Sequence, residues 1–314
     1  MYKACIVGRE GTTGLRIDER LQTHPDVEVL PIPEELRKDV PTIMKVAKES
    51  DVVFLCLPDQ ASKDIVAACQ EEWTETTGPV VIDASTAFRV DPSWAYGFPE
   101  LSKEHRQQIQ TAKWIANPGC HASGMIAIWY PLMQKGLLTN TYHGAATSLT
   151  GYSGGGKSMI QSYDGEDKGI DLYAPRHYAL GQQHKHLPEV VHQCGLATEP
   201  IIMPIVDDYY SGMLVSVPLV MDDFMDHMTM EQIFEVYQKA YQDSPLISVE
   251  SQDTGMISAN TMSGYDGMKI LVTGQDGRVV VHALYDNLGK GASGAAIQNM
   301  NIALGLTETT GLHI

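Results

Sequence analysis

Cys120 lies in "NPGCHASG" (117–124), directly after a Pro-Gly turn and at the start of an apolar run that predicts a helix. The N-terminal end of a helix favours the thiolate, which is the reactive form of a cysteine. Of the other four cysteines, Cys5 and Cys56 lie in predicted strands, Cys69 lies in a predicted helix and Cys194 lies near a helix end. We expect all four to be small core residues. Cys120 is therefore the candidate nucleophile, with a buried structural cysteine as the alternative.

A nucleophilic cysteine needs a group that exchanges its proton. "QQHKHLPEV" (182–190) supplies His184 and His186, with Glu189 three residues further along. We expect one imidazole to exchange a proton with Cys120 while Glu189 orients it, although spacing does not choose between the histidines. Zinc is a second interpretation of the pair, but no third and fourth ligand follows, so no metal is predicted. A solvated surface pair is a third.

"GREGTTG" places Gly8, Gly11 and Gly14 between a predicted strand and a predicted helix. In that context small residues let backbone N–H groups approach a pyrophosphate, which favours a dinucleotide over an ordinary glycine turn. The acid that binds a ribose hydroxyl is expected about 20 residues on. Glu28 lies at that distance, but it is inside the predicted strand rather than at its end. Three nearby cations favour NADP(H) instead: Arg9, Arg37 and Lys38.

A second glycine run, "GYSGGGKS" (151–158), satisfies the P-loop pattern. A P-loop joins a parallel strand to a helix, yet the residues after Ser158 are polar and predict a poor helix, and the parallel pattern ends earlier. We expect Ser153, Gly154 and Lys157 to hold a substrate phosphate. A flexible glycine turn and a P-loop NTPase are the alternatives.

Arg89, in "DASTAFR", is a further candidate for an anionic substrate group, because arginine binds carboxylates and phosphates through two parallel hydrogen bonds. An interdomain salt bridge with Asp83 or Glu100 is an equal alternative. Asn287 and Gly289 lie near the start of the last predicted helix, where they either face the cofactor or cap the helix.

The elements that position these residues form two patterns. The first third alternates strands and helices, which predicts a doubly wound parallel sheet. After about residue 120 the pattern predicts an α+β domain that ends in a hairpin at 268–287 and a helix at 290–306. Predicted strands lie at 3–8, 26–32, 51–58, 78–85, 142–150, 199–206 and 212–221, and helices at 13–24, 41–50, 60–73, 121–138 and 230–243.

Composition limits the classes of function. The 314 residues carry a net charge of -17, so nucleic acid is an unfavourable partner. Neither an apolar segment long enough to span a membrane nor a basic leader is visible, and the five cysteines form no CxxC pairs. We therefore expect a cytoplasmic protein that acts on a small molecule.

Seven stretches together resemble the N-acetyl-gamma-glutamyl-phosphate reductases of arginine biosynthesis, in their shorter form. They run in the family's order from one end of the chain to the other. "NPGC" and the final helix are also found in aspartate-semialdehyde dehydrogenase, whereas H-x-H-x-P-E favours the acetylglutamyl enzyme. The charged Arg9 and Glu10 depart from the family's usual small residues. The stretches are "GREGTTG", "VIDASTAFRV", "YGFPEL", "NPGCHASG", "GYSGGGK", "HKHLPE" and "DNLGKGASGAAIQNMN".

The resemblance implies a Rossmann-like domain at 1–118 and 291–314 and a catalytic domain like that of glyceraldehyde-3-phosphate dehydrogenase at 119–290. It implies NADPH-dependent reduction of N-acetyl-glutamyl phosphate to the semialdehyde through a thioester on Cys120, with His186 as the acid/base, in a homodimer or homotetramer. Aspartate-semialdehyde dehydrogenase is the alternative activity. The implied cofactor-binding residues are Gly8, Gly11, Thr12, Thr13, Gly14, Ser85, Asn287 and Gly289, and the substrate-binding residues are Arg89, Ser153, Gly154 and Lys157.

Overall fold

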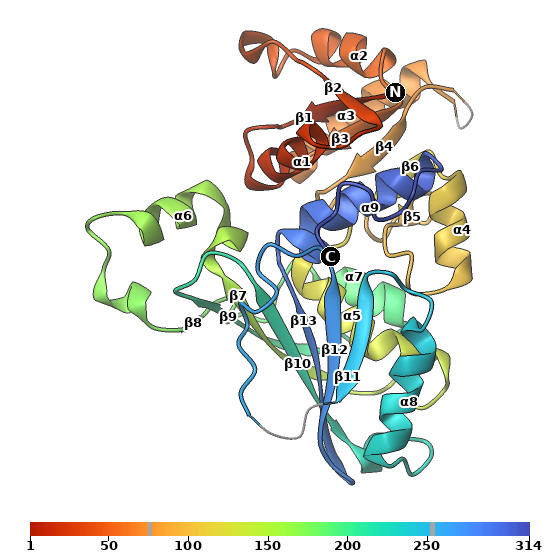
Figure 1. Ribbon diagram of the computed structural model, residues 1–314, viewed down its shortest axis with the longest axis vertical. Coiled ribbons are helices and arrows are strands. Elements are labelled where there is room, and N and C mark those ends of the chain that lie inside the picture. The colour runs from red at the N-terminus through yellow and green to blue at the C-terminus, as the bar shows by residue number, and fades with distance from the viewer. Residues whose placement is uncertain (75–76, 252–254) are drawn as a thin grey trace. The chain divides into compact units, whose positions relative to one another are not determined.

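The computed structural model describes residues 1–74, 77–251 and 255–314, and the chain divides into two compact units (Figure 1). The first unit comprises Met1–Gly119 and Ala292–Leu312, and the second comprises Cys120–Gly291 and His313–Ile314. The chain leaves the first unit directly before Cys120. The last two residues belong to the second unit, where the backbone N–H of His313 donates to Asp266 at 3.0 Å.

The first unit is built on a six-stranded sheet in the order β2-β1-β3-β4-β6-β5, with every neighbouring pair parallel. β3 is buried along its whole length, as its continuous apolar run requires when helices cover both faces. The predicted doubly wound parallel sheet is confirmed. The strands are β1 (Tyr2–Val7), β2 (Val27–Leu30), β3 (Val52–Leu55), β4 (Val80–Asp83), β5 (Ala95–Tyr96) and β6 (Trp114–Ala116).

Two hydrophobic clusters hold the helices on the two faces of this sheet. Ile17 of α1 and Ile297 of α9 share one cluster, whereas Ile43 of α2 and Ile65 of α3 share the other. Helices α1, α4 and α9 therefore cover one face of the sheet, and α2 and α3 cover the other. The helices are α1 (Thr12–Gln22), α2 (Val40–Lys48), α3 (Asp59–Glu72), α4 (Lys103–Thr111) and α9 (Gly294–Ala303), with a 3₁₀ turn, η1, at Glu34–Leu36.

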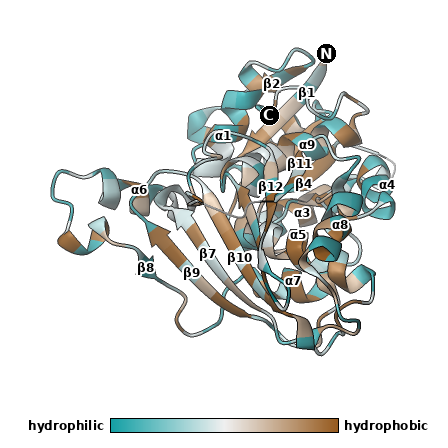
Figure 2. Ribbon diagram, turned by 60° about the horizontal axis from the view of Figure 1, so that its bottom comes forward, coloured by the Kyte–Doolittle hydropathy of each residue, from teal (hydrophilic) through white to brown (hydrophobic). Residues whose placement is uncertain are grey.

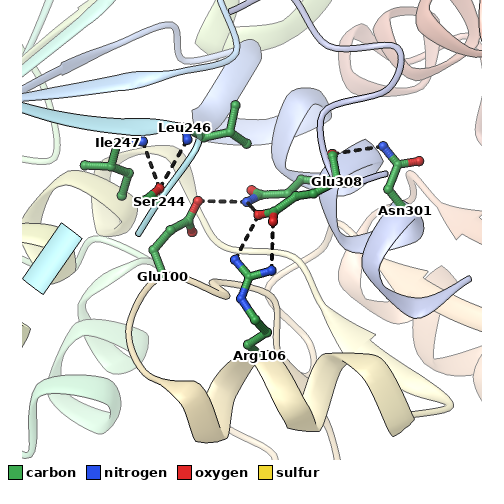
Figure 3. Close-up of polar contacts among 8 residues, drawn as sticks. Glu100, Arg106, Ser244, Leu246, Ile247, Asn301 and Glu308 are labelled. Atoms are coloured by element: carbon green, nitrogen blue, oxygen red, sulfur yellow. Dashed lines mark hydrogen bonds and ion pairs between the residues drawn. The ribbon is translucent and has the colours of Figure 1, made fainter. Parts of the chain in front are cut away.

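Polar side chains bind the last helix to the rest of the first unit (Figure 3). Both guanidinium nitrogens of Arg106 donate to the Glu308 carboxylate, at 2.8 and 3.0 Å. The Gln298 amide nitrogen lies 2.7 Å from both Glu100 and Glu308. Asn301 donates to the Glu308 carbonyl oxygen at 3.0 Å. Residues close to the C-terminus thus complete the unit that the N-terminus begins.

The second unit contains a seven-stranded mixed sheet in the order β11-β12-β13-β10-β7-β9-β8. The predicted hairpin is confirmed as antiparallel β12 and β13, which pair Met268 with Tyr285. β7 pairs in parallel with β9, and β11 with β12, so the predicted α+β half is built on a mixed sheet. The strands are β7 (Ala145–Gly151), β8 (Arg176–His177), β9 (Ile201–Asp207), β10 (Met213–Val220), β11 (Ile247–Ser251), β12 (Met268–Gln275) and β13 (Arg278–Tyr285).

Helix α5 is the central helix of the second unit and is hydrophobic almost throughout (Figure 2). It packs on β10 so closely that a Cβ at Gly124 would lie 2.6 Å from Val215. Across the described ranges, no helix is long and apolar enough to cross a membrane. The helices are α5 (Cys120–Gln134), α6 (Gly156–Asp164), α7 (Leu187–Cys194) and α8 (Met230–Tyr241), with 3₁₀ turns η2 (Tyr152–Gly155), η3 (Ile170–Tyr173) and η4 (Met221–Asp223) and a π-helical turn, η5, at Gly289–Ser293.

Candidate active site

The first glycine loop joins β1 to α1 at the carboxyl edge of the parallel sheet. Gly8 adopts a φ of +85°, and a Cβ there would collide with the Cys56 carbonyl oxygen. A Cβ at Gly14 would collide with the Gly8 carbonyl oxygen, and Gly11 is the N-cap of α1. Only glycines allow the turn to be this tight, and the α1 N-terminus presents first-turn N–H groups at its end. The loop therefore fits a pyrophosphate.

Two of the three cations expected to meet a 2′-phosphate, Arg9 and Arg37, form ion pairs with acidic side chains. Arg9 lies 2.5 Å from Asp18 in an ion pair, with 46% of the Arg9 side chain exposed. Arg37 pairs with Glu34 at 2.5 Å and lies 3.9 Å from Glu10. A bound phosphate would have to share these guanidinium groups with carboxylates. The choice of NADP(H) by these residues stays a prediction.

Ser85 and Arg89 are both held by groups of the first unit. The Ser85 hydroxyl donates to the buried Asp83 carboxylate at 2.6 Å. Burial raises the Asp83 pKa, against hydrogen bonds from Ser62 and Ser85 and the charge of Arg89. The Arg89 guanidinium donates to the carbonyl oxygens of Asn117 and Ala84, at 2.9 and 3.1 Å. Arg89 thus fixes the backbone that leads to the cysteine, while its contact with substrate stays a prediction.

Cys120 is the first residue of α5. Its carbonyl oxygen accepts a hydrogen bond from the Tyr285 hydroxyl at 2.5 Å, and a Cβ on Gly291 would lie 3.0 Å from the Cys120 Cβ. The glycine leaves room beside the thiol-bearing carbon. Burial raises the thiol pKa of the other cysteines, to about 12 for Cys5, Cys56 and Cys69, with Cys194 also raised. Those four thiols stay protonated at neutral pH.

Three imidazoles and a phenol form a cluster next to the start of α5. The ring centroid of His121 lies 5.0 Å from that of His184 and 5.7 Å from that of His186, and the latter two lie 4.7 Å apart. His121 Nδ1 is 2.7 Å from the Ser148 hydroxyl, and its Nε2 is 2.5 Å from the Tyr178 hydroxyl. The structure brings the two predicted histidines together. Among the described residues, no group of three or more His, Cys, Asp or Glu side chains could hold a metal ion.

His121 and Tyr178 are site residues that the sequence patterns did not single out. A lone histidine within the apolar run after Cys120 was the available signal, because a buried imidazole requires polar partners. Tyr178 follows the short strand β8, and nothing in its local sequence marks it.

Burial keeps two imidazoles of the cluster, His121 and His184, neutral. Burial, with help from His184 and Lys185, lowers the pKa of His121 to about 3. Burial and Lys185 lower the pKa of His184 to about 4. Burial raises the pKa of Tyr178, and negative charge on Cys120 raises it further. The last effect indicates that the Tyr178 hydroxyl and the Cys120 sulfur are close enough to interact electrostatically.

His186 and Glu189 lie at the start of α7. His186 is its N-cap residue and is 5% exposed. Glu189 lies in the first turn and is buried, at a helix end that favours negative charge. This placement is compatible with the predicted proton exchange at His186, which stays a prediction.

The second glycine loop differs from its predicted form. Residues 156–164 form helix α6, which the polar sequence did not predict. Tertiary contacts stabilise this helix, because Tyr163 is buried and stacks on Tyr152 with ring centroids 4.6 Å apart. The backbone N–H groups of Gly151, Tyr152 and Ser153 donate to carbonyl oxygens at positions 212, 209 and 210. These three N–H groups are therefore engaged within the protein and are not directed at a phosphate.

The other residues expected to bind cofactor or substrate are either packed in the protein or exposed. The Asn287 amide donates to the Ser153 hydroxyl at 3.0 Å and accepts from the Gly212 N–H at 2.9 Å. A Cβ on Gly289 would collide with the Tyr265 carbonyl oxygen. Both residues therefore have a packing role, and their contact with cofactor stays a prediction. Gly154 and Lys157 are exposed and accessible to a ligand.

Comparisons with known proteins follow the same division of the chain. The family model described as the semialdehyde dehydrogenase NAD-binding domain matches residues 3–109, and that described as the semialdehyde dehydrogenase dimerisation domain matches residues 120–287. N-acetyl-gamma-glutamyl-phosphate reductases from Rhizobium etli and Sinorhizobium medicae are each 40% identical over 309 residues, covering 96% of this chain and 98% of the relative. The chain belongs to the N-acetyl-gamma-glutamyl-phosphate reductase family.

Membership of this reductase family makes the chain an oxidoreductase. The solved structures support the fold alone. Aspartate semialdehyde dehydrogenase II from Vibrio cholerae has a TM-score of 0.72 at 16% identity, covering 97% of this chain and 99% of that one. The aspartate semialdehyde dehydrogenase with NADP from Candida albicans has a TM-score of 0.64 at 18% identity, covering 96% and 98%. The predicted fold, a Rossmann-like unit plus an α+β unit, is confirmed.

Proposed function

We propose that the protein reduces N-acetyl-L-glutamyl 5-phosphate to N-acetyl-L-glutamate 5-semialdehyde with NADPH, through a thioester on Cys120. One observation carries the proposal: Cys120 opens the buried helix α5 beside a cluster of three histidines, in a chain of this reductase family. The aspartate enzymes share the fold at far lower identity, so the shorter substrate is the second candidate.

Cys120 forms the covalent bond in this mechanism. Its thiolate attacks the acyl carbon, the carbon–sulfur bond forms, and the bond from carbon to the phosphate oxygen breaks, releasing inorganic phosphate. NADPH, when bound, supplies the hydride that reduces the thioester carbonyl. The resulting thiohemiacetal reforms its carbonyl as the carbon–sulfur bond breaks, which releases the semialdehyde and regenerates Cys120.

His186 is our candidate for the proton exchange. It takes the thiol proton before attack and returns a proton when the sulfur leaves, while the buried Glu189 in the same helix start orients it. Gly154, Lys157 and Arg89 are the candidates for the anionic groups of the substrate. A loop whose exposed residues include a lysine suits a phosphate that enters and leaves.

The first glycine loop is the candidate cofactor site, with Gly8, Gly11, Thr12, Thr13 and Gly14 around the pyrophosphate. Its support is the collision that a Cβ would cause at Gly8 and Gly14. The Candida albicans relative in fold was solved with NADP. We also propose a homodimer or homotetramer, on the basis of the dimerisation-domain match. The five free cysteines agree with a reducing cytoplasm.

The direct test runs the reaction in reverse. Purified protein receives NADP and phosphate with either N-acetyl-glutamate semialdehyde or aspartate semialdehyde, and NADPH formation is followed. We expect phosphate-dependent turnover of the acetylated compound, lost in Cys120→Ser and retained in the matched variant Cys69→Ser. Turnover of the aspartate compound alone would reassign the substrate. ATP hydrolysis without either turnover would instead identify the 151–158 loop as a nucleotide site.

A further inference from the structure

The two ring nitrogens of His184 have different surroundings. Its Nδ1 accepts a hydrogen bond from the backbone N–H of His186 at 3.2 Å. A backbone N–H can only donate, so Nδ1 carries a lone pair rather than a proton. In a neutral imidazole the single proton then resides on Nε2. The H-x-H spacing itself thus selects one tautomer.

The same hydrogen bond from a backbone N–H to Nδ1 occurs at His24 in the first unit. There the partners of both ring nitrogens identify the tautomer. The backbone N–H of Asp26 donates to His24 Nδ1 at 3.2 Å, and His24 Nε2 lies 3.1 Å from the Asn301 side-chain oxygen. The Asn301 nitrogen donates to the carbonyl oxygens of Glu308 and Thr310, which identifies the other amide atom as an oxygen acceptor. His24 therefore carries its proton on Nε2, as inferred for His184.

His184 and His24 differ in the hydrogen-bond partner of Nε2. Within the described ranges, no hydrogen bond is recorded for His184 Nε2, and the residue is only partly buried. The ring is held on three sides by His121, His186 and Tyr178, with centroids at 5.0, 4.7 and 6.1 Å. His184 thus presents a positioned N–H donor that a ligand can use.

Three titratable neighbours of His184, namely Lys185, His121 and Tyr178, either disfavour a charged imidazole or are neutral. Lys185 on the same segment is cationic and lowers the His184 pKa together with burial. His121 from α5 has a pKa lowered to about 3, and the Tyr178 pKa at the end of β8 is raised, so both stay neutral. The positive N-terminal end of α7 begins at His186, two residues on. His184 is neutral at physiological pH.

We propose that His184 is the electrophile of the reaction, whose Nε2–H donates a hydrogen bond to the substrate carbonyl oxygen as negative charge develops there. Under this assignment His184 does not exchange protons, and that role belongs to His186. The inference rests on the proposed function for its substrate. A donor aimed at a developing oxyanion stabilises the transition state more than the ground state.

The tautomer is measured first, on the unliganded protein, by ¹⁵N NMR of the histidine side chains. His184→Gln assigns the His184 signals, and His24 serves as the internal reference. We expect an Nε2-protonated neutral ring for His184 from pH 8 to pH 5.5. Protonation at Nδ1, or titration near pH 6.5, would overturn the inference without any reference to activity.

The role is then measured by the pH profile of kcat. We expect His184→Ala to lower kcat by about 10²-fold with both limbs of the profile unmoved. His184→Gln should recover part of the loss, because its amide N–H also donates. His192→Gln, at an exposed position of α7, is the matched control and should leave kcat unchanged.

Two results would contradict the electrophile role. Loss of one limb in His184→Ala would make His184 the proton-exchanging group. Equal kcat in His184→Ala and the unmodified protein would remove the role altogether. If the unmodified protein shows no phosphate-dependent turnover, the proposed function fails and the electrophile role fails with it, while the tautomer result is unaffected.

Discussion

Single thiols in this chain differ in their readiness to ionise. Burial raises the pKa of Cys5, Cys56 and Cys69 to about 12, whereas Cys120 lies at a helix N-terminus. We expect iodoacetamide at pH 7.5 to label one site, Cys120, as read by peptide mass spectrometry. Cys120→Ser is the control and should take up no label on the same timescale. First labelling at Cys56 or Cys194 would contradict the assignment of the nucleophile.

A second prediction at the residue scale concerns acid. His121 is buried and its pKa is lowered from 6.5 to about 3, so the unfolded chain binds its proton first as the pH falls. The free energy of unfolding should therefore fall between about pH 6.5 and pH 3, with a slope of up to about 1.4 kcal/mol per pH unit from this residue. Urea unfolding at several pH values measures it.

His121→Asn provides the comparison, because an amide can still meet the Ser148 and Tyr178 hydroxyls but does not titrate. The variant should show a shallower loss of stability over the same pH window, although it is less stable at pH 7. An unchanged slope would mean that the pKa of His121 is the same in the folded and the unfolded protein.

At the scale of elements, the strand-to-helix turn at Gly8 depends on the absence of a side chain. Its φ of +85° and the collision that a Cβ would make with Cys56 act together. Gly136 separates the two effects, because its φ is +67° and a Cβ there would meet nothing within 4 Å. Gly136→Ala should cost about 1 kcal/mol of stability, from backbone conformation alone.

Gly8→Ala should cost clearly more than this control in urea unfolding, because the clash adds to the backbone cost. It should also weaken NADP binding measured by fluorescence or calorimetry. Equal stability losses in the two variants would show that the loop relaxes around the added methyl group.

Local sequence predicts an element well where its apolar residues identify it. They form a continuous run in β3, recur with the helical period in α1 and alternate in the β12–β13 hairpin. It fails where distant contacts decide. Helix α6 is stabilised by stacking between Tyr152 and Tyr163, and this contact forms only when the chain folds. Strand β11 was missed because its polar residues give no alternation.

Prediction of the candidate site from the sequence is limited in the same way. Cys120, His184 and His186 are predictable because their types and spacing carry chemistry. His121 becomes a site residue only through Ser148, 27 positions away, and Tyr178, 57 positions away. The roles of Arg89 and Asn287 likewise depend on backbone groups that only the folded chain brings near them.

At the scale of the whole molecule, the first unit is assembled from both ends of the chain. α9 contributes Ala296, Ile297 and Met300 to the core around β1 and α1, and Arg106 pairs with Glu308. Loss of each large buried side chain costs about 2–5 kcal/mol. A fragment of residues 1–119 should therefore be unfolded, with poor dispersion in its ¹H–¹⁵N NMR spectrum.

The two segments of the first unit are separated in the sequence by residues 120–291, but they meet where the unit is interrupted. This allows a sharper test. The Asn117 side chain donates to the Ala292 carbonyl oxygen at 2.9 Å, so the two segments lie side by side within the unit. Residues 1–119 joined to 292–312 through a short glycine linker should restore a dispersed spectrum and NADP binding. Glu308→Ala in the joined chain should lower its stability, because Arg106 and Gln298 then lose their shared partner. A folded 1–119 fragment would instead show that α9 is dispensable, and the apolar contacts of its three core residues would then contribute little to folding.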